Sequence, residues 1–449
     1  MLRTENCRRD FVRLSGTALL AGSVGSRLLA NQSRRPRVAA VFTVFRFRSH
    51  AYDILENFIK PYLFRGTRVD PGVDLVSMYA DQFPQDDMAR DVSKRFNLPL
   101  YDSVDGALCC GKREMDVDAV LLIGEHGDYP YNELGQHMYP RKQLFDKIVA
   151  VMKKSNRFVP LFNDKHLSYR WDWAKEMYDT AKSLGIALQA GSSVPLASRR
   201  PMLELPPGCD IEEAVSVHGG GLESYDFHAL EVLQSMVESR RGGETGITRV
   251  ELLADEKLKA AQAAADWPHA LISAAMEAEK QHDEPRRVRP RVGVHAPQEE
   301  SVKNRKNTTA HAIRLTYRDG LRAIAVKVNS SSDRWNFACR LKNDPIPKAC
   351  MFFNGPWGNR NMFKALSHSI QHMFKTGTAA YPIERTLLTT GIVDAAMHSH
   401  HAGGQPIDTP QLTFAYAPRD FGAFRENGES WKILTGETPE PIEFTPGDA

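Results

Sequence analysis

Three ionisable side chains follow an apolar pair in the stretch LFNDKHLSY, which spans residues 161–169. Asp164, Lys165 and His166 are adjacent there, so they either belong to a site or form a solvated turn. A lysine can move protons at neutral pH where burial or a nearby cation brings its pKa toward neutrality. This stretch is therefore the first candidate for chemistry.

A second polar cluster comes after the apolar run 116–124. The stretch GEHGDYPYNELGQHMYP places Glu125, His126 and Tyr129 at the end of that run or just beyond it. Carboxylate and imidazole groups suit zinc or manganese, and His126 and His166 are the candidate ligands. Sequence spacing does not supply ligand geometry, however, and a polar loop packed on a sheet accounts for the same residues. We therefore expect no metal.

The first half of the chain carries the pattern of elements that must position these clusters. Apolar, β-branched runs alternate with amphipathic helical patterns, which predicts βαβ units and a parallel sheet with right-handed crossovers. Open α/β sheets bind ligands beyond the carboxyl ends of their strands, so both clusters belong at such an edge. The predicted strands are 37–45, 74–81, 116–124, 157–163 and 186–193, and the predicted helices are 50–64, 86–97, 141–156 and 171–185.

The second half of the chain has a different pattern of predicted elements. Strand-like and helical stretches no longer alternate regularly, and an Asp-Gly pair inside 310–329 predicts a hairpin. We therefore expect a mostly antiparallel sheet with helices. The predicted strands are 210–220, 246–255, the two arms of the hairpin, 335–341 and 348–355, and the predicted helices are 227–243, 258–281 and 361–377.

Together these patterns predict an α/β fold class, in which an N-terminal Rossmann-like parallel sheet precedes an α+β domain with an open, mostly antiparallel sheet. The Rossmann-like domain spans 34–200 and the α+β domain spans 201–430. Within the second, 282–309 is rich in proline and charge and is expected to be an exposed insertion. Residues 431–449 form a C-terminal tail.

The N-terminus has the pattern of an export signal. Arg8 and Arg9 precede a modest apolar stretch at 14–24, and the pair followed by x-F-V resembles the twin-arginine type, which carries folded proteins across the membrane. The stretch is too short to span a bilayer stably. We expect 1–33 to direct the protein to the periplasm, the alternative being a basic disordered tail.

Composition excludes some classes of function. A net charge of +3 over 449 residues gives no reason to expect nucleic acid, and 42% hydrophobic content is that of a soluble globular protein. Five cysteines lie outside the signal, without any C-x-x-C pattern, so we expect neither a disulfide framework nor a zinc knuckle.

The order of elements and two motifs resemble the Gfo/Idh/MocA oxidoreductases. Asp164-Lys165-His166 stands where that family has E-K-P. The run GGGLESYDFHALE stands where it has a glycine-rich segment ending in D-x-G-x-H-x-x-D, and supplies His228. The family's acid four residues before this histidine is replaced by Ser224, with Glu223 and Asp226 as neighbouring substitutes. The likeness covers roughly 37–250 and 310–400.

The resemblance implies oxidation of a sugar or polyol with NAD or NADP, in a homodimer or homotetramer. It also implies a dinucleotide-binding type for the first domain and a substrate-binding and oligomerisation role for the second. Lys165 and His228, with Asp164 beside the lysine, would handle the proton of the substrate hydroxyl. The residues expected around the cofactor are Arg46, Arg48, Asp81 and Glu125, and those expected along the substrate edge are His126, Tyr129, His166, Glu223 and Asp226.

One departure from the family concerns the phosphate-binding turn. The first strand should run into G-x-G-x-x-G, whose glycines let the backbone approach the pyrophosphate, but this chain reads TVFRFRSHA. Phe45 and Phe47 would crowd that approach, whereas Arg46 and Arg48 could contact phosphate instead. Asp81, at the end of the second strand, stands where an acid would bind a ribose hydroxyl.

Two alternatives keep the fold without redox chemistry. One is a lyase, hydrolase or epimerase acting on carbohydrate, with or without a metal. The other is a non-catalytic carbohydrate-binding or scaffold protein of the envelope. The enzyme hypotheses all require Lys165 and His228 to converge on one cleft above the exit edge of the parallel strands.

Overall fold

The computed structural model describes residues 34–284, 310–441 and 443–447. The predicted export signal at 1–33 and most of the predicted insertion at 282–309 lie outside this part of the chain. Within it, no helix combines the length and the apolar character needed to cross a membrane.

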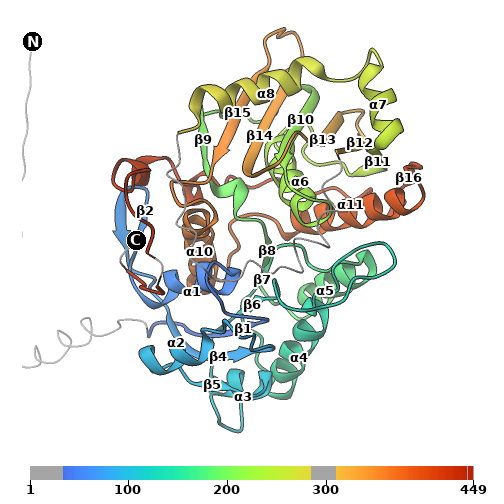
Figure 1. The fold of residues 1–449 in the computed structure, drawn as a ribbon. Helices are drawn as coiled ribbons and strands as arrows, with labels where there is room; N and C mark the ends of the chain where they lie inside the picture. Colours follow the sequence, from blue (N-terminus) through green and yellow to red (C-terminus); the bar gives the residue numbers. More distant parts are fainter. Residues whose placement is uncertain (1–33, 285–309, 442, 448–449) are drawn as a thin grey trace, which may run out of the picture. The chain divides into compact units, whose positions relative to one another are not determined.

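The first sheet is parallel and six-stranded, with the order β5-β4-β1-β6-β7-β8 (Figure 1). Its strands are buried on both faces, which explains why they read as nearly continuous apolar runs in the sequence. The predicted parallel sheet is confirmed, and β5 is an additional short strand. The bounds are β1 (Arg37–Phe42), β4 (Asp74–Ala80), β5 (Leu100–Tyr101), β6 (Ala119–Ile123), β7 (Leu161–Asp164) and β8 (Leu188–Gly191).

Helices connect these strands, and one of them is shorter than the sequence predicted. The helix expected at 50–64 ends at Ile59, because Lys60 precedes Pro61 and takes an extended conformation. The chain then forms a hairpin of β2 (Tyr62–Phe64) and β3 (Thr67–Val69). The helices are α1 (His50–Ile59), α2 (Ala89–Phe96), α3 (Val104–Cys109), α4 (Arg141–Lys154) and α5 (Trp171–Ser183).

The second sheet has eight strands in the order β16-β11-β12-β13-β10-β14-β15-β9. Every neighbouring pair is antiparallel except β10 and β13, so the predicted mostly antiparallel sheet is confirmed. The bounds are β9 (Ser198–Arg200), β10 (Ile211–Gly219), β11 (Ile247–Ala254), β12 (His311–Tyr317), β13 (Arg322–Lys327), β14 (Ser331–Leu341), β15 (Lys348–Phe353) and β16 (Ile407–Asp408).

Helices cover both faces of this sheet. α6 (Ser224–Val237) and α11 (Ile383–His401) share one apolar core with it, and α8 (His269–His282) packs on the opposite face. The single helix expected at 258–281 is instead two helices. α7 (Asp255–Ala263) ends where Ala264 becomes extended, and Pro268 precedes the first residue of α8.

The C-terminal part of the chain returns to the first sheet. α10 (Asn359–Thr376) packs against α1, and Phe363 and Leu366 join the core that contains β1. Phe444, which has no exposed surface, belongs to the same core. The last described residues therefore complete the packing of the first sheet.

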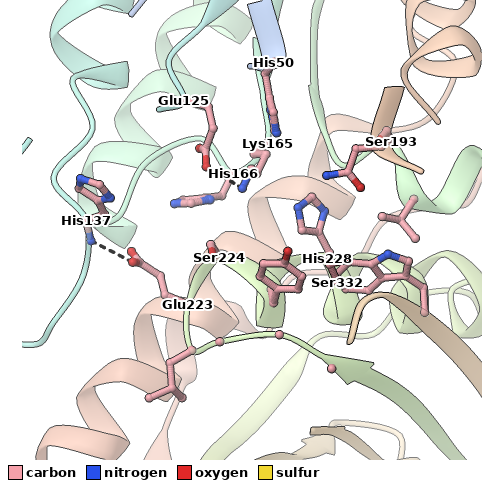
Figure 2. A pocket seen from close by; sticks show the side chains of 18 of the residues that line it. His50, Glu125, His137, Lys165, His166, Ser193, Glu223, Ser224, His228 and Ser332 are labelled. Carbon is pink, nitrogen blue, oxygen red and sulfur yellow. Dashed lines mark hydrogen bonds and ion pairs between the residues drawn. The ribbon is translucent and has the colours of Figure 1, made fainter. Parts of the chain in front are cut away.

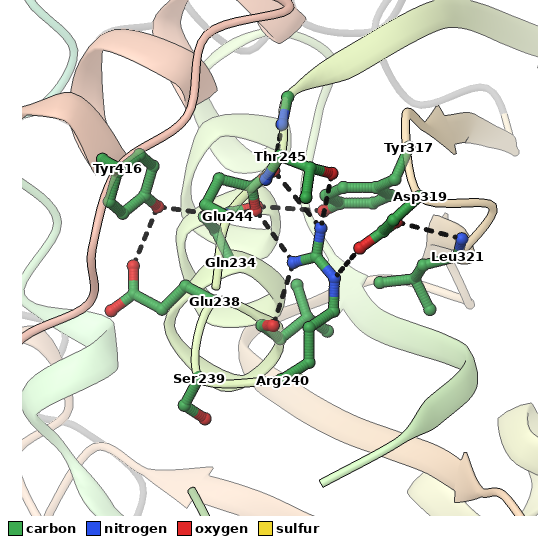
Figure 3. A network of polar contacts seen from close by, with 12 residues as sticks. Gln234, Glu238, Ser239, Arg240, Glu244, Thr245, Tyr317, Asp319, Leu321 and Tyr416 are labelled. Carbon is green, nitrogen blue, oxygen red and sulfur yellow. Dashed lines mark hydrogen bonds and ion pairs between the residues drawn. The ribbon is translucent and has the colours of Figure 1, made fainter. Parts of the chain in front are cut away.

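A buried polar network holds the C-terminal end of α6 (Figure 3). Arg240 donates to Glu244 at 3.0 Å and to Asp319 at 2.7 Å, while Gln234 and Tyr416 join the same group. Arg240 and Glu244 are 4% and 1% exposed. A buried pair with this many hydrogen bonds is compensated, so it fixes the helix in register with the hairpin that carries Asp319.

Candidate active site

A cavity of about 620 Å³ lies beyond the carboxyl edge of the first sheet (Figure 2). One wall comes from the ends of β6 and β7 and from the start of α1. The other comes from the end of β10, the start of α6 and the start of β14. The polar residues that line these two walls include His50, Glu125, His126, Lys165, His166, Glu223, His228, Lys327 and Ser332.

Lys165 occupies a left-handed turn directly after β7. Its φ is +55°, which is uncommon for a residue with a side chain, and its backbone forms an isolated bridge with Gly191. Its amine lies 2.7 Å from Glu125 Oε1, and the side chain is almost fully buried. Holding a lysine in this conformation costs free energy, and residues strained in this way cluster at functional sites.

Glu125 sits between two cations. It pairs with Lys165 and with the guanidinium of Arg141, which is fully buried. Burial alone would raise the pKa of Glu125, but the charges of Lys165 and Arg141 outweigh it and hold that pKa well below its usual range. Glu125 is therefore ionised and orients the amine of Lys165.

His228 lies on the second turn of α6 and faces the same cavity. Its Nδ1 is hydrogen-bonded to Ser192 Oγ, which also accepts from the backbone N–H of Val194 at 3.1 Å. Burial, with the nearby charge of Lys165, holds the pKa of His228 well below its usual range, so the imidazole is neutral. No other hydrogen bond to this ring is made within the described residues, which leaves Nε2 for a molecule in the cavity.

Lys165 and His228 thus line one cavity at the carboxyl edge of the parallel strands, as the enzyme hypotheses require. Asp164 does not reach it. Its carboxylate turns to His50 Nδ1 at 2.6 Å and so ties the start of α1 to the end of β7. His50 is the member of this pair that lines the cavity.

Two further histidines in the cavity have ring nitrogens without partners. His126 Nε2 and His166 Nδ1 are buried and form no hydrogen bond within the described residues. His166 Nε2 lies 3.1 Å from Arg141. Burial, aided by neighbouring positive charges, holds the pKa of both imidazoles well below its usual range. Both imidazoles are therefore neutral, and each has one buried ring nitrogen without a partner among the described residues.

Glu223 supplies a protonated acid on the opposite wall. It adopts φ +66° and caps α6, and its Oε2 accepts from the backbone N–H of His137 at 2.9 Å. Burial raises the pKa of Glu223 to about 8, so this carboxyl group is largely neutral at pH 7. It can donate a hydrogen bond or a proton into the cavity.

Three of the predicted site residues are engaged outside the cavity. The Tyr129 hydroxyl donates to Asp81 at 2.7 Å, and the Tyr79 hydroxyl donates to the same carboxylate at 2.9 Å. Asp226, expected along the substrate edge, is buried against His218 and His311. None of Tyr129, Asp81 or Asp226 lines the cavity. A ribose hydroxyl could bind Asp81, as predicted, only by displacing the hydroxyl of Tyr79 or Tyr129.

The connection from β1 to α1 would have to hold the phosphates of a dinucleotide. Phe45 does not crowd it, because its ring is fully buried against Phe42 and Tyr52. Arg48 pairs with Glu440. Arg46 is half-buried, and its side chain makes no hydrogen bond or ion pair with the described residues. Its charge helps to depress the pKa of His126, which lines the cavity, although Arg46 itself does not line it.

These observations decide how a dinucleotide would fit. The cavity, with its carboxylate, amine and imidazoles, suits the nicotinamide end, and Arg46 can replace the missing glycine-rich backbone as the phosphate contact. Arg48 and Asp81 reach a cofactor only by giving up their present partners. The residues present therefore fit a dinucleotide that is held by arginine.

Sequence reasoning missed several residues of the cavity. Arg141 was assigned only to its helix, although it lies immediately after the polar cluster at 124–140. Trp335 and Lys327 were assigned only to strands, and strand periodicity says nothing about which end of a strand borders a cavity. A signal existed for the serine pair Ser331 and Ser332, which sits in the polar run NSSSD, untypical of a buried strand.

The fold and the site together define an α/β protein with a parallel sheet, a mostly antiparallel sheet and a polar cavity at the carboxyl edge of the parallel sheet, and solved dehydrogenases share this fold. GenD2 from gentamicin A biosynthesis, solved with NAD, superposes with a TM-score of 0.52 at 12% identity over 83% of this chain and 96% of that one.

Two further solved structures have the same fold. A probable dehydrogenase from Thermotoga maritima (TM-score 0.50, 10% identity) covers 84% of this chain and 99% of its own. A myo-inositol dehydrogenase from Corynebacterium glutamicum (TM-score 0.50, 10% identity) covers 83% and 98%. At these identities the likeness establishes the fold alone. No family model and no curated protein matches the sequence.

Proposed function

We propose that this protein is an exported oxidoreductase that acts on a sugar or polyol hydroxyl with a tightly held nicotinamide dinucleotide. The observation that carries the proposal is the meeting of Lys165, ion-paired with Glu125, and the neutral His228 in one cavity at the carboxyl edge of the parallel sheet. The solved dehydrogenases with this fold, one of them bound to NAD, support the choice of reaction.

The protonation state of each residue in the cavity determines its proposed role. Lys165 can donate an N–H to the reacting hydroxyl oxygen while Glu125 fixes the amine. In the tautomer whose Nδ1–H donates to Ser192 Oγ, Nε2 of the neutral His228 imidazole carries no proton and accepts the hydroxyl proton. His126, His166 and the protonated Glu223 hydrogen-bond the other hydroxyls of the substrate. A bound nicotinamide would supply a hydride acceptor, with Arg46 near its phosphates.

Dinucleotide binding is the first test. Mass spectrometry of the denatured purified protein should reveal NAD or NADP, or calorimetry on the stripped protein should show one site per chain. Arg46→Ala should weaken binding at least tenfold, whereas Lys94→Ala, at an exposed position on α2, should not. If no dinucleotide co-purifies or binds, the proposal fails.

Catalysis is tested separately, with a panel of polyols and sugars and the ultraviolet absorbance of reduced nicotinamide as the readout. Export is tested by cell fractionation, with Arg8 and Arg9 both changed to lysine as the variant that should stay in the cytoplasm. A protein that remains cytoplasmic with its native N-terminus would contradict the export part alone.

A second candidate follows from Arg48 and Asp81, which are bound by Glu440 and by Tyr79 and Tyr129. If those pairs are permanent, the same cavity suits acid–base chemistry without redox, as in a carbohydrate lyase or epimerase. Glu223 would then be the acid and His228 the base. Turnover of a carbohydrate without any bound dinucleotide would favour this candidate.

A further inference from the structure

A group of three buried side chains lies directly behind the cavity wall. His218 is on β10, Asp226 on the first turn of α6, and His311 at the start of β12. Their exposed fractions are 0%, 1% and 0%. One ligand atom from each lies within 4.8 Å of the others, a grouping that no proposed catalytic step uses.

Two distances within the group are those between ligands of one metal ion. His311 Nε2 lies 2.8 Å and His218 Nε2 lies 3.2 Å from the same oxygen, Asp226 Oδ1. Ligands at about 2.0–2.1 Å from a zinc ion are separated by roughly 3 Å, so the three atoms can surround one ion with little movement.

A hydrogen-bond network without a metal leaves His218 only partly satisfied. His311 Nε2 is hydrogen-bonded to Asp226 Oδ1, and His218 Nε2 shares that oxygen at the longer distance of 3.2 Å, while His218 Nδ1 has no hydrogen-bond partner within the described residues. A buried polar group left without a partner costs about 1–3 kcal/mol. The ring is held in place, since Trp335 lies parallel to it at 8°. His218 Nε2 is thus fixed beside the carboxylate oxygen that His311 also contacts.

We propose that His218, Asp226 and His311 bind one divalent transition-metal ion of the zinc class through Nε2, Oδ1 and Nε2. Two imidazoles and a carboxylate are a donor set that suits such ions. Within the described residues no fourth histidine, cysteine or acid joins the group. The sequence analysis expected no metal and named His126 and His166 as the candidates, so this site lies elsewhere.

The metal has a consequence for the cavity. The second oxygen of Asp226, Oδ2, accepts from the backbone N–H of Glu223 at 2.9 Å. Glu223 holds a left-handed backbone conformation at the start of α6 and faces the cavity. An ion that fixes Asp226 therefore fixes the backbone from which the acid Glu223 projects. Outer-shell contacts of this kind typically change metal affinity 10- to 100-fold.

The experiment measures metal content on the full-length protein. After incubation with Zn²⁺ and dialysis, elemental analysis should give about one zinc per chain, and less than a tenth of that in Asp226→Asn and His218→Gln. His401→Gln is the matched control, because it removes an exposed histidine from the histidine-rich end of α11 and should retain the ion.

A second measurement keeps the test independent of variant folding. The wild-type protein loaded with Co²⁺ should show visible absorption of a histidine-ligated ion, and Zn²⁺ should abolish it. The proposal is overturned if the wild type retains no zinc and shows no such absorption. It is also overturned if folded Asp226→Asn keeps the full zinc content, or if only His401→Gln loses it.

Discussion

The amine of Lys165 and the carboxylate of Glu125 form an ion pair of 2.7 Å at the carboxyl edge of the parallel sheet. Lys165 is on the turn after β7 and Glu125 is on the connection after β6, so two adjacent strands supply the two partners. Arg141 contacts Glu125 from the start of α4. The backbone geometry that produces this pair requires Lys165 to adopt a positive φ, which costs free energy.

Removing the amine should abolish most of the activity while leaving the fold. We expect Lys165→Met to lower kcat about 100- to 10,000-fold, the range typical for loss of a group that takes part in proton transfer. Glu125 keeps Arg141 as its partner, so the variant should remain folded. The measurement is steady-state kinetics on the preferred polyol, with Lys153→Met on the exposed face of α4 as control. Equal kcat in wild type and Lys165→Met would contradict the assignment.

The raised pKa of Glu223 makes stability depend on pH. Burial raises the carboxyl pKa from its ordinary value of 4.5 to about 8 in the folded protein, so between these pH values the folded state binds more protons than the unfolded one. The free energy of unfolding of the wild type should therefore fall, relative to Glu223→Gln, by up to about 1.4 kcal/mol per pH unit as pH rises through this window.

Urea denaturation at a series of pH values measures this difference. Below pH 4.5 the Glu223 carboxyl is protonated in the folded and in the unfolded state. In that range the stability of the wild type and of Glu223→Gln should change with pH in parallel. A difference that stays constant from pH 5 to pH 8 would show that Glu223 is not held protonated by the fold.

Ser192 should act through His228. Ser192→Ala leaves the buried Nδ1 of His228 without its hydrogen bond, which should cost about 1–3 kcal/mol of stability. Because Ser192 no longer selects the tautomer, kcat should fall more than KM rises, and the loss should depend on pH. Ser183→Ala, at an exposed position on α5, is the control. Unchanged kcat and pH profile in Ser192→Ala would remove Ser192 from the mechanism.

The polar network at the end of α6 should contribute strongly to the stability of the fold. Arg240→Met leaves the buried carboxylate of Glu244 uncompensated, which typically costs about 3–5 kcal/mol. Adding Glu244→Gln should recover part of this loss, since the uncompensated charge is removed. Arg241→Met is a matched control, because Arg241 is the next residue in the chain and its side chain is 75% exposed. Chemical denaturation of the four proteins checks the prediction, and similar values for Arg240→Met and Arg241→Met would contradict it.

The sequence predicted the two sheets well because their patterns are local. Alternating apolar runs and amphipathic helices define the parallel half, and the Asp-Gly turn at 319–320 defines the hairpin of β12 and β13. The resemblance of Asp164-Lys165-His166 to E-K-P located the turn that carries Lys165. It did not predict that Asp164 faces His50 rather than the cavity, because side chains after a strand can turn to either face.

Long-range partners were beyond the sequence for a physical reason. His218, Asp226 and His311 come from segments up to 93 residues apart, and nothing local to any of them marks their meeting. The pairing of Arg48 with Glu440 likewise joins residues that are 392 positions apart in the sequence. Such contacts depend on how the sheets pack, which single-sequence patterns do not encode.

Phe444 stacks edge-on against Phe45, Tyr52 and Phe96, at centroid distances of 5.1, 5.0 and 5.8 Å. These three rings precede Phe444 by 348 to 399 residues in the sequence. The core around β1 and α1 therefore cannot close until Phe444 has been synthesised, although N-terminal domains generally fold first. A substitution or truncation that removes Phe444 therefore acts on packing around residues that were made several hundred positions earlier.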